Sequence, residues 1–259
     1  MLPIDEVRAA RDRIEDVVRH TKLARQRTMS EKAGASVFLK GENEQRTGSF
    51  KVRGATNRIR SLEPAERDAG VITASAGNHA QGVALAADWS GVDAVVVMPE
   101  YASISKVRAT RGYGAEVVLH GQDYDDAQDH AHALAAETGR TYVHAFDDEA
   151  VMAGQGTIGL EILDDLPSVD TVVVPVGGGG LIGGIATAIK AESPGTRVIG
   201  VQAAGAASLP GALQKGPDFE LESVDTIADG IATGQVGRKP LAVIEKRVDD
   251  VVTVGDAEI

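Results

Sequence analysis

Short runs rich in valine and isoleucine alternate with longer helical segments along most of this chain, and this alternation restricts the fold more than any other feature. We expect strands at residues 71–73, 92–98, 115–119, 141–144, 171–176, 197–201 and 251–254. The segments between them have the length and composition of helices, such as residues 78–89 and 181–191. Continuous β-branched strands joined by helices are typical of a parallel sheet covered on both faces. The sequence therefore predicts an α/β fold.

Charge and composition limit the classes of function. The formal net charge is −12, and an acidic surface attracts neither nucleic acid nor an anionic membrane. There is no cysteine, which excludes disulfides, zinc–thiolate sites and thiol nucleophiles. The first residues have no signal-peptide pattern, and Pro175 and several glycines divide the uncharged run 171–189. We therefore expect a cytoplasmic protein without a membrane span.

Lys51 lies close to the predicted start of a helix, which is an unusual place for a cation. Ser49 is a typical N-cap residue, and residues 50–62 contain no helix breaker except Gly54. The positive end of the helix dipole disfavours an ammonium group, so a shielded lysine here should have a pKa below the ordinary value of about 10.4. A neutral lysine is a base and a nucleophile, as Schiff-base chemistry requires. Position alone also allows an ordinary surface lysine.

Four consecutive glycines follow the predicted strand 171–176 and precede a helix. Glycines let the backbone approach an anion closely, and the amides of the following helix point at it, so this turn has the pattern of a phosphate cradle. Gly178, Gly180 and Gly183 also satisfy the spacing of a dinucleotide-binding turn. That site needs an acidic residue after the next strand, where Gln202 stands instead. A single phosphomonoester is therefore favoured, and a purely structural turn remains an alternative.

A second polar turn, Ser75-Ala-Gly-Asn-His79, joins the end of a predicted strand to the start of a helix. Ligands commonly sit at this end of parallel strands. Ser75, Gly77 and Asn78 offer groups that bind an anion such as a substrate carboxylate, whereas we expect His79 to be structural. His130 and His132 point to different helix faces and make a poor metal pair. We likewise expect structural roles for the other histidines, His20, His120 and His144.

Three motifs occur in order along the chain, namely Ser49-Phe-Lys-Val-Arg-Gly-Ala55, Ser75-Ala-Gly-Asn-His79 and Gly177-Gly-Gly-Gly180. Together they resemble the site motifs of the fold type II pyridoxal-phosphate enzymes, in the threonine dehydratase (threonine ammonia-lyase) and serine racemase branch. Ala153-Gly-Gln-Gly-Thr157 and Thr226-Ile-Ala-Asp-Gly230 also resemble that branch. The match covers nearly the whole chain, and the combination of motifs is specific.

The resemblance implies a tryptophan synthase β-like fold with two three-layer αβα domains. Residues 1–70 and 147–259 would form the large domain that binds pyridoxal 5'-phosphate, and residues 71–146 the small domain, with the cofactor between them. Family members continue past the position of Ile259, and a serine or cysteine in that continuation bonds the pyridine nitrogen. We therefore expect the large domain to be incomplete at its C-terminal end.

The resemblance also assigns roles to residues of this chain. Lys51 would bind the cofactor as a Schiff base and later remove the substrate Cα proton. Phe50 and Gly230 would enclose the pyridine ring, and Asn78 would bond the ring oxygen. The phosphate would be held by Gly177, Gly178, Gly179, Gly180 and Leu181. The substrate carboxylate would lie on the turn formed by Ser75, Ala76, Gly77, Asn78 and His79.

The implied reaction is the conversion of L-threonine to 2-oxobutyrate and ammonia, in isoleucine biosynthesis or threonine catabolism, with L-serine as a secondary substrate. Serine racemases of this branch carry a serine at the position of Ala76, so we expect weak racemisation. The divalent-cation site of the branch uses acids where Gln202, Ala206 and Ser208 stand here, so we expect no metal. A homodimer or homotetramer is implied.

Three alternatives remain open at this stage. The chain could be a serine racemase or another β-eliminating or β-replacing enzyme of the fold. A nicotinamide-binding oxidoreductase is disfavoured by Gln202 and by Lys51. A non-catalytic protein that keeps the fold belongs to a different functional class.

Overall fold

The structure is a computed structural model that describes residues 1–259, and its strands form three separate sheets. A small antiparallel pair joins β1 (Leu23–Arg25) and β2 (Phe38–Lys40). The other two sheets are parallel throughout. Their strands are β3 (Val71–Ala74), β4 (Ala94–Met98), β5 (Glu116–Leu119), β6 (Thr141–Tyr142), β7 (Thr171–Pro175), β8 (Arg197–Ala203) and β9 (Asp250–Val254).

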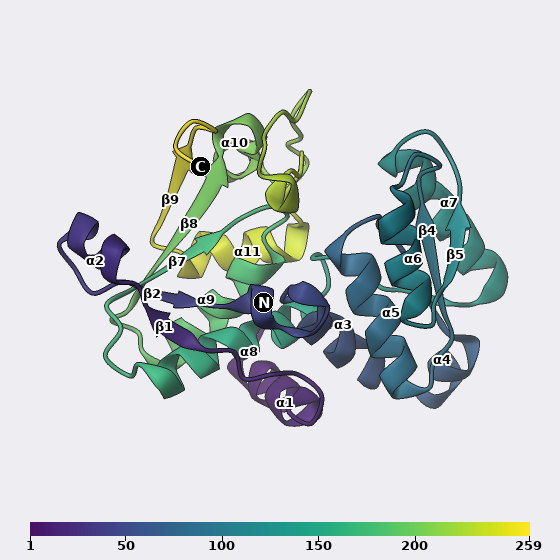
Figure 1. Ribbon diagram of the computed structural model, residues 1–259, viewed down its shortest axis with the longest axis horizontal. Coiled ribbons are helices and arrows are strands. Elements are labelled where there is room, and N and C mark those ends of the chain that lie inside the picture. The colour runs from purple at the N-terminus through teal and green to yellow at the C-terminus, as the bar shows by residue number, and fades with distance from the viewer.

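Eleven α-helices connect and cover these strands (Figure 1). They are α1 (Ile4–Ile14), α2 (Arg27–Ala33), α3 (Lys51–Arg60), α4 (Pro64–Ala69), α5 (Asn78–Ser90), α6 (Ile104–Gly112), α7 (Tyr124–Thr138), α8 (Glu149–Asp165), α9 (Gly180–Glu192), α10 (Ser208–Lys215) and α11 (Arg238–Arg247). No helix combines the length and apolar character needed to cross a bilayer. The α/β fold with parallel sheets that the sequence predicts is confirmed.

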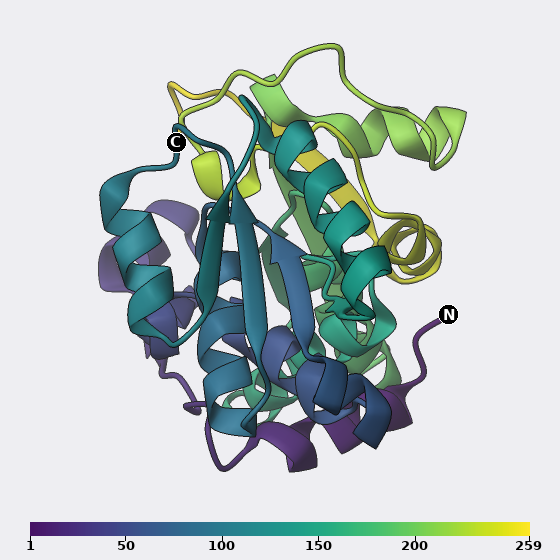
Figure 2. The same cartoon turned by 90° about the vertical axis from the view of Figure 1, so that its right-hand side faces the viewer.

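The four-stranded sheet has the order β5-β4-β3-β6 and is covered on both faces. Val71 and Val96 point toward α5, where they join the largest apolar cluster, while Ile72 and Val97 point toward α7. Figure 2 views this sheet from the side that α7 covers. Because the central strands β3 and β4 are buried on both faces, their sequences are almost continuously apolar rather than alternating.

The three-stranded sheet has the order β7-β8-β9, and its buried face packs against α8, α9, α10 and α11. Val172, Val174 and Val198 supply the strand side of this core. On the other face Val173 is 60% exposed and Val252 is 41% exposed. The burial pattern of β7 therefore alternates, as it does in a strand that is covered on one side.

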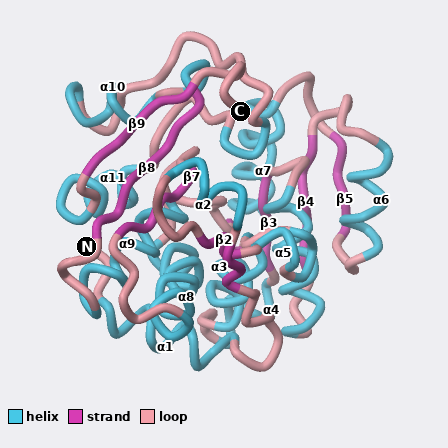
Figure 3. The backbone as a smooth tube through the Cα atoms, turned by 60° about the vertical axis from the view of Figure 1, so that its left-hand side comes forward, coloured by secondary structure: helices cyan, strands magenta, loops and turns pink.

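Helices α3 and α8 lie between the two parallel sheets (Figure 3). Glycines let α3 pack closely on both neighbours: a Cβ on Gly154 of α8 would lie 2.6 Å from the Arg53 carbonyl oxygen, and a Cβ on Gly82 of α5 would lie 3.1 Å from the Lys51 backbone. Lys51, at the start of α3, is thereby fixed against α5 on one side while α3 packs on α8 on the other.

Some local predictions differ from the structure. The helical spacing of Ile4, Val7, Ile14 and Val17 predicts a helix over residues 4–19, but α1 ends at Ile14. Pro64, which follows the predicted helix of residues 50–62, predicts only the end of that helix. In the structure it is also the first residue of α4, and Glu63 and Glu66 form a capping box there. Ser49 is extended, as a residue before a helix should be, but its buried hydroxyl has no hydrogen-bond partner and caps nothing. This part of the prediction was wrong.

Candidate active site

A pocket of about 70 Å³ brings the lysine and the glycine turn together. Of the residues predicted for the site, it is lined by Phe50, Lys51, Gly177, Gly178, Gly179, Gly180, Leu181 and Gly230. These residues come from the start of α3, the β7–α9 turn and the segment before α11. Segments more than one hundred residues apart in the sequence therefore form a single site.

The Lys51 amine points into this pocket and donates a hydrogen bond of 2.8 Å to the carbonyl oxygen of Ala145. Its Nζ lies 5.5 Å from the centre of the Phe50 ring, and no carboxylate pairs with it. Burial lowers the pKa of the Lys51 amine to about 8. A substantial fraction of this amine is therefore neutral near physiological pH, whereas an exposed lysine is almost fully charged.

We expect Lys51 to react with an amine-directed reagent at lower pH than the other lysines of the cofactor-free chain. The midpoint of its labelling should lie at about pH 8, because only the neutral amine is nucleophilic. Lys32, whose side chain is exposed, serves as the internal control. Peptide mass mapping across a pH series measures both, and equal midpoints would contradict a buried, readily deprotonated amine.

The β7–α9 turn presents a row of free backbone amides. None of the amides from Gly177 to Ile182 donates a hydrogen bond, and the first amide with a partner is that of Gly183, which donates to the Gly179 oxygen at 2.9 Å. Gly179 has a φ of +89°, a conformation that favours glycine. The N-terminus of a 13-residue helix adds the positive end of its dipole. The turn is therefore built to receive an anion.

Phe146 explains why the turn contains glycine at two further positions. A Cβ on Gly178 would overlap the Phe146 ring, and a Cβ on Gly180 would lie 2.8 Å from the Phe146 Cβ. We expect Gly178→Ala to cost about 1–3 kcal/mol, through displacement of the ring or of the turn. Thermal melting with and without pyridoxal phosphate should show a lower Tm and a smaller stabilisation by the ligand.

Gly195→Ala is the matched control for this substitution. Gly195 is exposed, and a Cβ there would meet nothing within 4 Å. Its Tm and its response to the ligand should be unchanged. A Gly178→Ala protein that behaves like the control would show that the turn does not need this close contact.

The Ser75–His79 turn lies beside this pocket but does not line it. It follows β3 and leads into α5, whose Gly82 packs on the Lys51 backbone. The Ser75 hydroxyl accepts a hydrogen bond of 3.1 Å from the Gly77 amide. His79 is buried, and its Nε2 lies 2.9 Å from the Val143 oxygen. Burial, and then the nearby Lys51 charge, lower the pKa of His79 to about 3, so it is neutral at physiological pH.

Several residues of the pocket have no place in the sequence-based site. Ala145, Phe146 and Thr233 line it without any motif to mark them. Gln155 also lines the pocket, and its Oε1 accepts a hydrogen bond of 3.2 Å from the Gly54 amide while its Nε2 has no partner. Gln155 belongs to the Ala153–Thr157 motif, but the family resemblance implies no role for its side chain. Unpaired buried polar atoms are rare and mark places where a bound group is expected.

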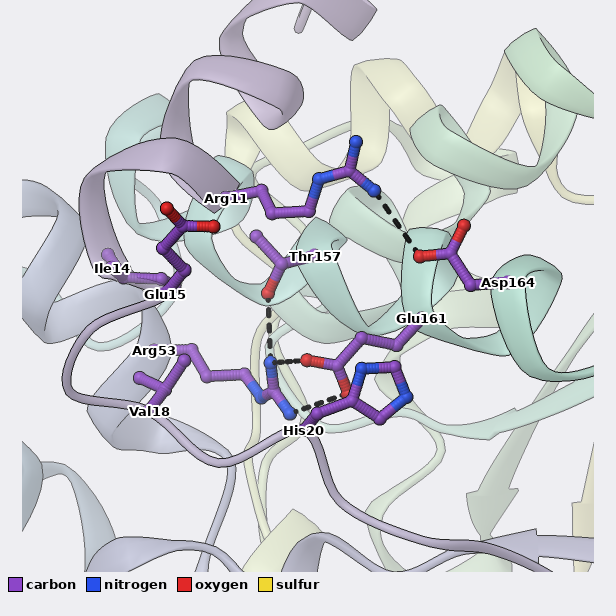
Figure 4. Close-up of a pocket in the computed structure, with 9 residues that line it drawn as sticks. All are labelled: Arg11, Ile14, Glu15, Val18, His20, Arg53, Thr157, Glu161 and Asp164. Atoms are coloured by element: carbon purple, nitrogen blue, oxygen red, sulfur yellow. Dashed lines mark hydrogen bonds and ion pairs between the residues drawn. The ribbon is translucent and has the colours of Figure 1, made fainter.

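A second cavity, of about 140 Å³, is lined by residues of α1, α3 and α8, among them the ion pairs Arg11–Asp164 and Arg53–Glu161 (Figure 4). At its base the Arg53 side chain is fully buried and bonds Glu161 through two nitrogens, at 2.6 and 3.0 Å. Arg53 also bonds Glu42 at 2.8 and 2.9 Å, and Lys40 pairs with Glu161 at 2.8 Å. This network fixes α3 two residues after Lys51, and no motif in the sequence marks it.

The predicted positions for a cation carry no acidic cluster. The Gln202 side chain is buried, and its Oε1 accepts a hydrogen bond of 2.8 Å from the Leu209 amide. No group of three or more His, Cys, Asp or Glu side chains anywhere in the chain is arranged to hold a metal ion.

The residues of the site fit the cofactor that the sequence resemblance implies. Pyridoxal phosphate needs an amine for its aldehyde and a cradle for its phosphate. Lys51 offers a buried amine, and residues 177–182 offer unpaired amides in the same pocket. The glycines leave no side chain that would fill the cradle.

Comparison with known proteins identifies the group to which this chain is related. The family model described as pyridoxal-phosphate dependent enzyme matches residues 14–259. An L-threonine ammonia-lyase of Thermotoga maritima is 48% identical over all 259 residues, which correspond to 65% of that protein's length. The chain thus spans slightly less than two thirds of this relative.

Two solved structures have nearly the same fold. The processed form of threonine deaminase isoform 2 from Solanum lycopersicum superposes with a TM-score of 0.94 at 43% identity, covering 97% of this chain and 69% of that one. Maize serine racemase gives a TM-score of 0.95 at 36% identity, covering 98% of this chain and 77% of that one. With the family match over nearly its whole length, this chain belongs to the pyridoxal-phosphate-dependent enzymes.

Proposed function

We propose that this chain carries the catalytic centre of a pyridoxal-phosphate-dependent ammonia-lyase that converts L-threonine to 2-oxobutyrate and ammonia, with L-serine as a slower substrate. One observation carries the proposal: a buried amine with a pKa of about 8 shares a pocket with a row of unpaired backbone amides. The similarity to an L-threonine ammonia-lyase and to a threonine deaminase supports the choice of substrate.

Each part of the site would have a separate task. The amides of residues 177–181 would bind the cofactor phosphate, and Lys51 would hold the cofactor through its amine. Phe50 and Gly230 both line the pocket and would enclose the ring. Asn78, the first residue of α5, would bond the ring oxygen. When bound, pyridoxal phosphate supplies an electron-withdrawing ring that stabilises negative charge at the substrate Cα.

Proton transfer at Cα would be the task of Lys51. Its lowered pKa keeps enough neutral amine near pH 7 for the amine to accept a proton, as a general base must. The Ala145 oxygen, 2.8 Å away, fixes the direction of this amine. The substrate carboxylate would bind at Ser75, Gly77 and Asn78. In the net reaction the Cα proton and the Cβ hydroxyl leave as water, and hydrolysis then releases ammonia and 2-oxobutyrate.

The direct test supplies the purified chain with pyridoxal phosphate and L-threonine and measures 2-oxobutyrate. We expect product from L-threonine and slower formation of pyruvate from L-serine. Binding of the cofactor without product from either amino acid would favour the non-catalytic alternative.

The similarity to maize serine racemase makes racemisation the second candidate activity. Ala76 has no exchangeable proton, so it cannot deliver one to the face of Cα opposite Lys51. We therefore expect D-serine to form far more slowly than pyruvate when L-serine is the substrate. Chiral chromatography of the reaction mixture measures both products, and comparable rates would contradict the assignment.

The larger organisation of the protein forms part of the same proposal. Residues 71–146 would act as a small domain against a large domain of residues 1–70 and 147–259, with the cofactor between them. A homodimer or homotetramer in the cytoplasm, independent of a divalent cation, would be the working form. Light scattering tests the assembly, and a rise in Tm with Mg²⁺ or Ca²⁺ would argue for a cation.

A further inference from the structure

The segment of residues 143–147 crosses from the end of β6 to the start of α8 and contributes two parts of the pocket wall. The Ala145 carbonyl oxygen accepts the hydrogen bond from Lys51 Nζ. The Phe146 ring lies directly against Gly178 of the anion cradle. The position of this short segment therefore affects both the amine and the phosphate side of the site.

Anchors hold the segment at both ends. At one end the Val143 oxygen accepts hydrogen bonds from the Thr73 hydroxyl and from His79 Nε2, each at 2.9 Å. At the other end Asp147 Oδ1 accepts a hydrogen bond of 2.8 Å from the Lys239 amide. Between these anchors the chain bends at residues 145–147 and forms no helix or strand, so its amides need a local acceptor.

His144 supplies that acceptor. Its Nδ1 accepts hydrogen bonds from the Phe146 amide at 3.2 Å and from the Asp147 amide at 2.8 Å. The imidazole also packs edge-on against the Phe146 ring, with centroids 4.7 Å apart and an interplanar angle of 87°. One side chain thus fixes two successive amides and the ring between them.

We propose that His144 is a positioning residue of the active site: as a neutral imidazole it holds the turn that aims the Ala145 oxygen at Lys51 and seats Phe146 behind the glycine cradle. The inference rests on the proposed function, because Lys51 and the cradle matter only if they act on the cofactor. Nδ1 can accept the two amides only while it carries no proton. Protonated His144 would instead present an N–H group to two N–H groups.

The surroundings of His144 favour the neutral form. Burial, chiefly, lowers its pKa below the ordinary value, and Lys51 of α3 and His132 of α7 lower it further. Asp147, at the end of the segment, and Asp148, which follows it, raise the pKa of His144 in opposition. The folded state therefore binds this proton less readily than the unfolded state, and the stability that this difference contributes is lost as the pH falls from about 6.5 through the lowered pKa.

Two substitutions of equal size distinguish the effect of the hydrogen-bond acceptor from the effect of the shape of the side chain. His144→Asn places an oxygen at the same number of bonds from Cα as Nδ1, and asparagine commonly accepts such nearby amides. It cannot be protonated in this pH range. His144→Leu has the same branching as asparagine but no acceptor.

The experiment measures two properties of the full chain without cofactor. The first is the hydrogen-exchange protection of the Phe146 and Asp147 amides by NMR across a pH series. The second is the midpoint pH for labelling of Lys51, with Lys32 as the internal control. Wild-type protection should fall as the pH drops through the pKa of His144.

His144→Asn should keep protection within about threefold of wild type and remove its acid-side loss, whereas His144→Leu should lose about tenfold or more. In the leucine variant water reaches the amine, so the Lys51 midpoint should rise from about 8 toward the ordinary value near 10.4. The asparagine variant should keep the wild-type midpoint.

The proposal is overturned if His144→Leu keeps the protection of the Phe146 and Asp147 amides, or if it loses that protection while the labelling midpoint of Lys51 stays unchanged. It is also overturned if His144→Asn loses the protection as His144→Leu does. Should the leucine variant not fold, the comparison of wild type with His144→Asn across pH decides the question: an acid-side loss of protection in both would overturn it. Neither readout needs the cofactor, so failure of the chain to bind pyridoxal phosphate would contradict the proposed function alone.

Discussion

Lys51→Ala should lower 2-oxobutyrate formation from L-threonine by at least about 10³-fold, because one side chain would supply both the cofactor attachment and the base at Cα. The purified variant is assayed with excess pyridoxal phosphate, so a simple loss of affinity can be compensated. Lys32→Ala is the matched control. Lys32 lies exposed on α2 and forms no ion pair, and its removal should leave activity unchanged.

The fold should survive the loss of Lys51. Between about pH 8, the pKa of Lys51 in the folded chain, and about pH 10.4 the unfolded state binds more protons than the folded state, so stability rises with pH in that window. Below the window the buried ammonium is a cost, and Lys51→Ala removes it. An unfolded variant would make the activity loss uninformative, whereas a folded variant that still forms 2-oxobutyrate would contradict the role of Lys51.

Glu161→Ala should destabilise the protein by about 3–5 kcal/mol, because it removes the carboxylate that two buried cations, Arg53 and Lys40, share. Glu161 bonds the fully buried Arg53 at 2.6 Å and Lys40 at 2.8 Å, and the side chains of Lys40 and Glu161 are only 7% and 8% exposed. Urea denaturation measures the change in unfolding free energy.

Glu192→Ala is the control, since Glu192 bonds Arg8 at the same distance of 2.6 Å, but with side chains that are 35% and 50% exposed. Water replaces such a partner, so little change is expected there. Equal effects of the two substitutions would show that the Arg53 network contributes no more than a surface ion pair. A large loss at Glu161 should also lower cofactor affinity, because α3 carries both Arg53 and Lys51.

The local pattern of the chain predicts most of the fold. Continuous valine and isoleucine runs match the parallel strands, and the glycines and polar turn residues mark where helices begin. The error at Ser49 has a clear cause: residue type suggests a cap, but the cap requires a hydroxyl directed at the helix amides, and tertiary packing buries it elsewhere. Pro64 likewise supports two interpretations, and only Glu63 and Glu66 together distinguish a helix start from a helix stop.

The site is less accessible to sequence reasoning, because much of it is made by backbone. Lys51 and the glycine turn carry side-chain or glycine signals, and the structure brings them into one pocket. The Ala145 oxygen has no sequence signature, since any residue could supply it. The partners of Arg53 lie 11 and 108 positions away, and nothing in their spacing indicates that they meet.

The central claim is that the Lys51 amine and the glycine cradle together receive pyridoxal phosphate. Borohydride reduction of the chain mixed with one equivalent of the cofactor, followed by peptide mass mapping, tests it most directly. The account predicts a single covalent adduct on Lys51. Gly178→Ala should lower the yield of this adduct, and excess free lysine added before the reduction should not displace the cofactor from Lys51. An absent adduct, or one spread over exposed lysines such as Lys32 with Lys51 unmodified, would contradict it.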